Sequence, residues 1–183
     1  MLLHLRRSFI LSAIFLVLFG LAYPLAGTGL AQAFFGHQAN GSLTANGSTL
    51  IGQTWTGPKW FQGRPDGTVL TNKSDQVVVS GTNQPGPLSA SLEKSVAQQA
   101  EVLKKEGIIP TNDLVTTSGS LVDPDISPSD GYAQVGAVAA ARGLPPATVR
   151  QTVASHVHSR ELGFLGAPYV DVLELNDALA KLG

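Results

Sequence analysis

Phe9-Ile-Leu-Ser-Ala-Ile-Phe-Leu-Val-Leu-Phe-Gly-Leu-Ala-Tyr-Pro-Leu-Ala26 decides how this chain is organised, because Ser12 is its one conspicuously polar residue. Extended to Leu30, the segment would form a helix of about 33 Å, which is enough to cross a membrane. Gly20 and Pro24 weaken the helix towards its outer end, and a membrane helix tolerates this when a neighbouring helix or interfacial water takes up the freed carbonyl. The sequence therefore predicts a transmembrane helix over residues 8–30.

The charges around this segment predict its orientation. Arg6 and Arg7 lie just before it, and no Asp, Glu, Lys or Arg occurs between Arg7 and Lys59. The positive-inside rule then puts residues 1–7 in the cytoplasm and residues 31–183 on the outer side of the membrane.

A cleaved signal peptide is the competing interpretation of the same segment. It would have a basic start, an apolar core and the cleavage motif Ala31-Gln32-Ala33. The apolar core is longer than the usual 7–15 residues, and the motif lies far from Arg7. In both interpretations the remainder of the chain is exported. A mature protein that starts at Phe34 would exclude the membrane anchor.

Composition excludes several classes of function. The 183 residues include 12 Lys+Arg and 13 Asp+Glu, a net charge of −1, which argues against nucleic acid as a partner. The part expected outside the membrane has 10 basic and 13 acidic residues, so its net charge does not favour binding to anionic lipid headgroups. The absence of cysteine removes disulfides, thiol catalysis and thiolate metal sites.

The exported part predicts one α+β domain. Short strands are expected at residues 49–55, 59–61 and 77–79, followed by a loop at 80–87 that is rich in turn formers. Three helices and a final strand–helix pair are expected after this loop. Strands that precede helices favour an α+β architecture over an alternating parallel sheet.

Capping residues define the predicted helices. The first begins at Ser89 or Ser91 and ends at Gly107, and the second runs from the capping box at 127–130 to Gly143. Pro145-Pro146 opens the third helix. A strand at 169–173 and a helix from Asn176 end the chain. The residues expected to face inward are Leu92, Val96, Ala100, Leu103, Tyr132, Val135, Ala139, Val149, Val153, Val157, Leu179 and Leu182.

Ser118 and Ser120, which flank Gly119 between carboxylates, suggest a serine hydrolase. A nucleophile elbow requires G-x-S-x-G, and the histidines are only His4, His37, His156 and His158. We therefore favour a turn-rich loop in which Asp and Ser side chains bond the local backbone.

Metal and phosphate chemistry find no better support. His156 and His158, with Glu161 nearby, would point to nearly opposite sides of a helix and could not share one ion. The chain has no G-x-x-x-x-G-K-[ST] motif and no segment like a P-type phosphorylation loop. We therefore assign no catalytic residue and no metal ligand.

Partner contact is the remaining candidate function. Trp55, Trp60 and Phe61 with Arg64 could form an interaction patch, although core packing is the commoner fate of such aromatic residues. Tyr23 and Pro24 in the membrane segment complete the candidate partner interface.

Several motifs occur in register with one known family. They are His37-Gln-Ala-Asn-Gly-Ser-Leu43, Leu50-Ile-Gly-Gln53, Trp60-Phe-Gln-Gly-Arg-Pro65, Asp113-Leu-Val-Thr-Thr-Ser-Gly-Ser120, Asp123-Pro-Asp-Ile-Ser-Pro128, Ala141-Arg-Gly-Leu144, Leu162-Gly-Phe-Leu-Gly166 and Val172-Leu-Glu-Leu-Asn176, after one membrane segment that contains Tyr23-Pro24. Over nearly its whole length the chain closely resembles the C subunit of the potassium-transporting Kdp ATPase, the KdpC family.

The resemblance implies a single-pass inner-membrane subunit with an external domain. Its expected partners are a channel-like A subunit, a P-type ATPase B subunit that hydrolyses ATP, and a small F subunit, together a high-affinity potassium uptake system. The family retains its membrane helix, which favours the anchor over the signal peptide. A secreted or anchored binding module with a cleaved signal peptide is the alternative.

The family is described as a catalytic chaperone that raises the ATP affinity of the B subunit through a transient ternary complex. The predicted topology puts almost all of this chain on the side away from cytosolic ATP. A coupling through the partner's conformational equilibrium must be reciprocal. We therefore prefer a role in assembly and in shaping the external potassium entrance, with no cofactor bound stably.

Five residues depart from the family's usual pattern. Asp125 replaces the usual His, Asp66 the usual Ser, and Ala167, Tyr169 and Asp171 the usual Glu, Arg and Asn. The loop at 80–87 also differs from the family's usual sequence. These departures argue against a universal role for those particular side chains.

Overall fold

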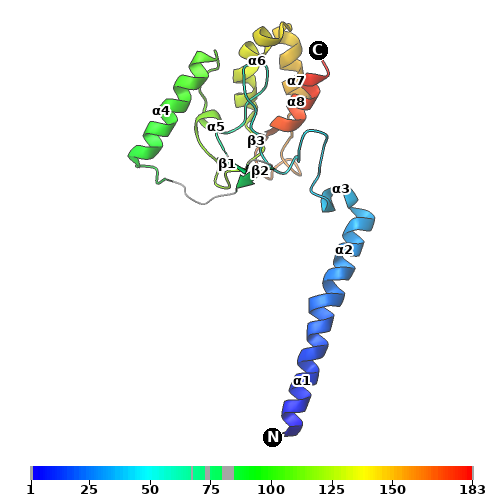
Figure 1. The fold of residues 1–183 in the computed structure, drawn as a ribbon. Helices are drawn as coiled ribbons and strands as arrows, with labels where there is room; N and C mark the ends of the chain where they lie inside the picture. Colours follow the sequence, from blue (N-terminus) through cyan, green and yellow to red (C-terminus); the bar gives the residue numbers. More distant parts are fainter. Residues whose placement is uncertain (1, 67, 73–74, 80–84, 183) are drawn as a thin grey trace. The chain divides into compact units, whose positions relative to one another are not determined.

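The computed structural model describes residues 2–66, 68–72, 75–79 and 85–182. The chain forms two compact units, Met1–Leu43 and Thr44–Gly183 (Figure 1).

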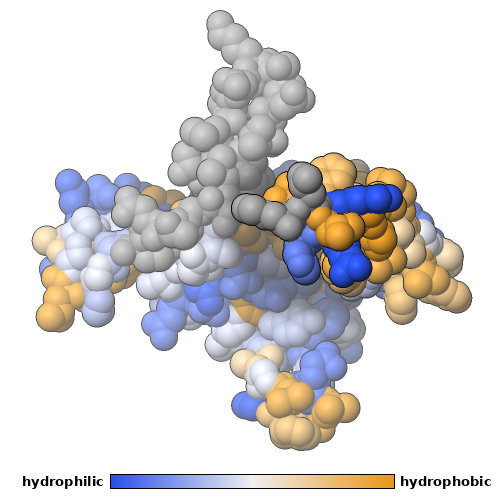
Figure 2. Space-filling model, turned by 90° about the horizontal axis from the view of Figure 1, so that it is seen from below, coloured by the Kyte–Doolittle hydropathy of each residue, from blue (hydrophilic) through white to orange (hydrophobic). Residues whose placement is uncertain are grey.

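The first unit is dominated by one long helix. It consists of α1 (Leu2–Val17), a π-helical turn η1 (Leu18–Ala22) and α2 (Tyr23–Phe34), and the short helix α3 (Gly36–Ala39) follows. The stretch Leu3–Phe34 is long and apolar enough to cross a membrane, and none of it is buried within the chain. Seen along its axis in Figure 2, this helix carries hydrophobic residues on its flanks and hydrophilic residues at its near end. Among the described residues, this is the one helix long and apolar enough to span a membrane, which agrees with the helix predicted from the sequence.

The π-helical turn lies where Gly20 and Pro24 were expected to weaken the helix. The N–H of Tyr23 donates to Leu18 O, five residues back. A proline inside an α-helix lacks an N–H, and its ring clashes with the carbonyl four residues earlier. Pro24 lies at the start of α2, and the wider turn before it accommodates the ring.

The second unit contains five helices among its described residues. They are α4 (Ala90–Lys105), α5 (Asn112–Val115), α6 (Pro128–Arg142), α7 (Pro146–Ser155) and α8 (Val172–Ala180). Two antiparallel strand pairs accompany them: β1 (Thr68–Asn72) with β2 (Asp75–Val79), and β3 (Asp125–Ile126) with β4 (Val170–Asp171). This mixture confirms the predicted α+β class.

Capping explains most helix boundaries. The Oγ of Ser89 accepts a hydrogen bond from Ser91 N, and the Oγ of Ser127 accepts one from Asp130 N. Gly143 ends α6 with φ = 67°, in the left-handed region that favours glycine. The predicted starts at Ser89 and 127–130 and the predicted stop at Gly143 are confirmed.

Helices α6, α7 and α8 lie side by side and enclose most of the core, whereas α4 stands to one side (Figure 1). Fully buried core side chains include Val138, Val149, Val153, Leu175 and Leu179. Of the four α4 residues expected to face inward, Leu103 is buried, whereas Leu92, Val96 and Ala100 are only half-buried. Helix α4 therefore joins the core mainly at its C-terminal end.

The strands predicted at 49–55 and 59–61 are wrong, because the chain is irregular there. The backbone of Phe61 and Gln62 pairs with side-chain amides, as described below, so this segment is held in place without a neighbouring strand. The strand predicted at 77–79 is confirmed as part of β2. Within the predicted loop at 80–87, residues 80–84 lie outside the described part of the chain.

The end of the chain also differs from the prediction. Strand β4 is limited to Val170–Asp171, and α8 begins at Val172, four residues before the predicted Asn176. Asp171 is the reason, since its carboxylate accepts the N–H of Glu174 at 2.8 Å and caps the helix. Leu182, expected to face inward, lies beyond α8 and is 42% exposed.

Candidate partner interface

Tyr23 and Pro24 lie on the membrane segment, directly after the π-helical turn. Tyr23 is 72% exposed and forms no hydrogen bond through its hydroxyl within the described chain. The structure therefore leaves both residues open to a partner in the membrane.

Trp55 and Trp60 form an aromatic pair in the second unit, with ring centroids 5.0 Å apart. The guanidinium of Arg142 lies 4.6 Å from the centroid of Trp60. Two hydrogen bonds hold it there, from Nε to Lys59 O at 2.8 Å and from Nη1 to Leu179 O at 3.0 Å. We call Trp55, Trp60 and Arg142 the tryptophan–arginine cluster. Both indoles are half-buried, so the cluster supports the core and still presents an amphipathic surface.

Phe61, grouped with these tryptophans in the sequence, is fully buried in the core. Its backbone is fixed by the buried Asn176, which accepts the N–H of Phe61 at 2.9 Å and donates to its carbonyl at 2.9 Å. Gln134, also fully buried, makes the same pair of bonds to Gln62, at 2.8 and 2.9 Å. Phe61 therefore belongs to the core and not to a surface that could contact a partner.

Sequence reasoning missed both amides. The sequence predicts Asn176 as the first residue of a helix, and no local pattern marks Gln134 as a buried, bonded amide. A buried amide that bonds a strand-like segment leaves no local pattern, because its partner is 115 residues away for Asn176 and 72 for Gln134.

Arg64 is engaged inside the domain. Its Nη2 lies 2.6 Å from Asp113 Oδ1, its Nε lies 3.4 Å from Asp123 Oδ2, and its side chain is 21% exposed. The two carboxylates neutralise the guanidinium, which therefore fixes loops together and offers little charge to a partner.

Asp113 and Asp130 share one environment at the start of α6. Burial raises the pKa of Asp130, and its hydrogen bond with Asp113 raises it further. Burial also acts to raise the pKa of Asp113, but hydrogen bonds from Asp130 and the Ser127 backbone, with the charge of Arg64, hold it below its usual range. As the pH rises, Asp113 therefore ionises before Asp130.

A pocket of about 300 Å³ opens beside this network. It is lined by Arg64, Asp113, Asp123, Asp125, Ile126, Ser127, Ala167, Pro168 and Tyr169. Burial, followed by the charges of Asp123 and Asp171, raises the pKa of Asp125 to about 6. Burial also raises the pKa of Asp171.

The departures from the family pattern gather around this pocket. Asp125, Ala167 and Tyr169 line it, and Asp171 faces Asp125 across the β3–β4 pair. The fifth departure, Asp66, accepts the backbone N–H groups of Ser118 at 2.5 Å and Asp123 at 3.2 Å. Four of the five substitutions are thus neighbours in space.

The serine loop forms turns through its own side chains. Ser120 Oγ accepts the N–H of Val122 at 3.2 Å, and Asp123 Oδ1 accepts that of Asp125 at 3.0 Å. The paired histidines are engaged elsewhere: the ring of His156 lies 2.8 Å from Thr152 O, and His158 stacks on Tyr169 and lies 3.1 Å from Glu174 Oε2. This arrangement favours the turn-rich loop over a hydrolase.

Helix α7 ends at Ser155, with His156 as its C-cap and His158 two residues further on, so the two histidines lie at the helix end. Within residues 2–66, 68–72, 75–79 and 85–182, no group of three His, Asp or Glu side chains is arranged to hold a metal ion.

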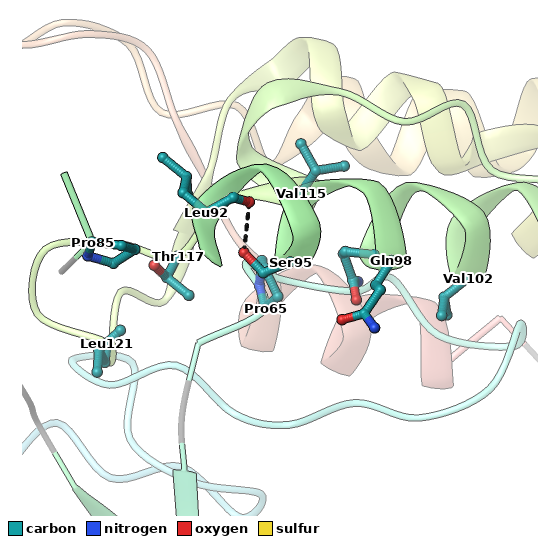
Figure 3. A pocket seen from close by; sticks show the side chains of 10 residues that line it. Pro65, Pro85, Leu92, Ser95, Gln98, Val102, Val115, Thr117 and Leu121 are labelled. Atoms are coloured by element: carbon teal, nitrogen blue, oxygen red, sulfur yellow. Dashed lines mark hydrogen bonds between the residues drawn. The ribbon is translucent and has the colours of Figure 1, made fainter. Parts of the chain in front are cut away.

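A second pocket, of about 450 Å³, lies along α4 (Figure 3). Leu92, Val115 and Leu121 supply apolar surface, while Ser95 donates to Leu92 O at 2.9 Å within the helix. Leu92 lines this pocket, and this is why it is only half-buried.

Known proteins resemble this chain over nearly its whole length. The family described as K+-transporting ATPase, c chain, matches residues 5–181. Proteins named potassium-transporting ATPase KdpC subunit are 45% identical in Caulobacter vibrioides (98% of this chain, 93% of that protein) and 44% in Methylobacterium nodulans (100% and 98%). The protein of that name from Sorangium cellulosum is 45% identical over 98% of both chains.

Proposed function

Since the chain belongs to the KdpC family of potassium-transporting ATPase subunits, we propose that it is a non-catalytic accessory and assembly subunit of a high-affinity Kdp complex. The family match over residues 5–181 carries this proposal. Two features support it: a long apolar helix that is exposed along its length, and a folded domain in which the carboxylates of Asp66 and Asp113 hold loops together.

We place the chain in the inner membrane with a cytoplasmic N-terminus at residues 1–7, a transmembrane helix at 8–30 and an external domain at 31–183. Arg6 and Arg7 support this orientation. The motif Ala31-Gln32-Ala33 lies inside α2, which supports an uncleaved anchor. In the alternative, cleavage would release a secreted binding module.

The proposed partners are the channel-like A subunit, the ATP-hydrolysing B subunit and the small F subunit, together with membrane lipid. The tryptophan–arginine cluster and the exposed Tyr23 are the surfaces we assign to these contacts. Large amphipathic aromatic residues and arginine are enriched at protein interfaces.

The proposal also concerns how this chain could change the ATP affinity of the B subunit. A chain with this topology acts on a cytosolic ATP site through the conformational equilibrium of the B subunit, so that ATP binding and subunit binding strengthen each other equally. Assembly and shaping of the external potassium entrance come first in our account. A transient ternary complex with ATP is the second candidate, favoured by the family's described role.

Deleting this chain distinguishes the assembly role from the effect on ATP affinity. We expect a complex without it to lose assembly and potassium uptake together, measured by co-purification of the A and B subunits and by ion flux. Full assembly and transport with a selective rise in the KM for ATP would instead establish the chaperone role.

A further inference from the structure

The loop between α7 and β4 exposes three large apolar side chains. Leu162, Phe164 and Leu165 are 81%, 69% and 49% exposed, although side chains of this size gain most from burial. They belong to the motif at 162–166, to which the proposed function gives no role. Neighbouring exposed apolar residues in a folded domain indicate a contact surface. We call Leu162, Phe164 and Leu165 the apolar tip.

The backbone holds the apolar tip in one shape. At the base of the loop, His158 and Tyr169 exchange two backbone hydrogen bonds, of 2.8 and 3.2 Å. Nearer the tip, Glu161 and Leu165 exchange two more, of 3.0 and 2.9 Å. Leu162 has φ = 52°, a left-handed conformation that leucine rarely adopts. The fold therefore keeps a strained residue at the point where its apolar side chain is exposed.

The apolar tip can enter an apolar phase without losing backbone hydrogen bonds to water. The N–H of Gly163 donates to Arg160 O at 3.1 Å. The N–H groups of Phe164 and Leu165 both donate to Glu161 O, at 3.2 and 2.9 Å. A bilayer penalises backbone donors that lack a partner. Three consecutive donors at the tip already have their partners within the loop.

The charges beside the apolar tip match a zwitterionic lipid headgroup. Arg160 and Glu161 are exposed, and within the described part of the chain neither side chain forms an ion pair or a hydrogen bond. A phosphatidylethanolamine headgroup carries a phosphate and an ammonium group, so it offers an opposite charge to each side chain. Long charged side chains keep their heads at the headgroup level while apolar neighbours are buried.

The domain that carries the loop is joined to the membrane segment by a short connection. Helix α2 ends at Phe34 and the second unit begins at Thr44, and ten residues span at most about 35 Å. The short helix α3 reduces this reach, and Gln32 and Asn40 exchange two side-chain hydrogen bonds, of 3.2 and 3.1 Å, across it. Such a tether gives the loop a high effective concentration of lipid, so that even a weak contact is occupied.

We propose that the apolar tip inserts into the lipid surface beside the membrane anchor, with Arg160 and Glu161 at the level of zwitterionic headgroups. The contact braces the folded domain against the membrane. It rests on the anchor of the proposed function and requires no other subunit. A protein partner is the weaker occupant, because protein interfaces carry about one hydrogen bond per 100–200 Å², whereas the donors of the tip are already bonded.

Photo-crosslinking of the full chain in cells grown in low potassium identifies the occupant. With a benzophenone side chain at Phe164, irradiation should increase the mass of the intact chain by that of one phospholipid. The same side chain at Leu88, which is completely exposed before α4, is the matched control and should form no lipid adduct. A protein adduct at Phe164, no adduct there, or equal lipid adducts at both positions would overturn the inference.

Depth-dependent quenching tests insertion directly. The chain has no cysteine, so Phe164→Cys provides a single site for a fluorescent dye in the purified full chain. In phosphatidylethanolamine–phosphatidylcholine vesicles, lipids with nitroxide-labelled acyl chains should quench this dye, whereas aqueous iodide should quench a dye at Leu88→Cys. Quenching at Phe164→Cys by iodide alone would overturn the inference. Loss of the residues before Phe34, seen in the mass of the intact chain, would instead overturn the anchor and the proposed function.

Discussion

Asp125 occupies the position where the family usually has histidine, and its carboxyl shares the β3–β4 region with Asp123 and Asp171. Burial and these neighbouring charges raise its pKa from 3.8 to about 6. Between those two values the folded state holds a proton that the unfolded state has released. The free energy of unfolding therefore falls as the pH rises from about 4 to 6, and the loss persists above 6.

Asp125→Asn should remove this penalty. We expect the variant to be about 1 kcal/mol more stable than the parent at pH 7.5 and equal to it at pH 4. This difference is smaller than the pKa shift alone implies, because the carboxyl is half-exposed and solvent screens its charge. Urea unfolding of the full chain in detergent at both pH values measures the difference. Glu93→Gln, which removes an exposed carboxyl from α4, is the control, and a gain of equal size at both pH values would contradict the assignment.

Asn176→Leu should be severely destabilising. The substitution leaves the N–H and the carbonyl of Phe61 buried without partners, which costs about 2–4 kcal/mol. The urea midpoint reports the loss. Asn46→Ala, which removes an exposed bond to Asp177, is the matched control and should cost less than about 1 kcal/mol. Equal effects of the two variants would show that the buried amide does not support the Phe61 segment.

For the candidate interface, the sequence predicts the residue types but not which side chains lie together. The aromatic character of Trp55 and Trp60 and the exposure of Tyr23 follow from residue type. The third member of their cluster, Arg142, was expected only to end a helix, because its position over Trp60 depends on the packing of α6 against the loop at Lys59. The ion pairs of Arg64 with Asp113 and Asp123 are likewise set by tertiary structure.

At the scale of elements, local capping signals predict the starts of helices better than apolar runs predict strands. Helices α4, α6 and α7 begin where Ser89, Ser127 and Pro145-Pro146 indicate. The segments at 49–55 and 59–61 have strand-like composition, yet side-chain amides satisfy the backbone at Phe61 and Gln62. Asp171-x-x-Glu174 is a capping signal at the start of α8, but the apolar run at 169–173 favours a strand over the same residues.

The cap of α8 can be measured with a pair of variants. Asp171→Asn keeps a capping oxygen and removes the charge, whereas Asp171→Ala removes both. We expect the alanine variant to be about 1 kcal/mol less stable than the asparagine variant at pH 7.5, by urea unfolding. Equal stability would show that the bond to Glu174 N does not stabilise the start of α8.

At the scale of the whole molecule, several of the family motifs in the second unit meet around one segment. Residues 60–66 contact Asp113, Ser118, Asp123 and Asn176 through Phe61, Arg64 and Asp66. The motifs at 60–65, 113–120, 123–128 and 172–176, which are far apart in the sequence, therefore belong to one structural network.

The membrane topology predicts a simple pattern of proteolysis. In spheroplasts, external protease should remove a C-terminal tag and leave an N-terminal tag intact, because residues 31–183 lie outside and residues 1–7 lie inside. Lysed cells, in which both tags are accessible, are the control. Protection of the C-terminal tag would reverse the proposed orientation.

The most direct test of the central claim is purification of the C-terminally tagged chain, in mild detergent, from cells grown in low potassium, with mass spectrometry of every stoichiometric partner and of the intact chain. Our account predicts a channel-like subunit and a P-type ATPase, together with this chain at its uncleaved mass. A protein that purifies alone and starts at Phe34 would contradict the account and establish a secreted binding module.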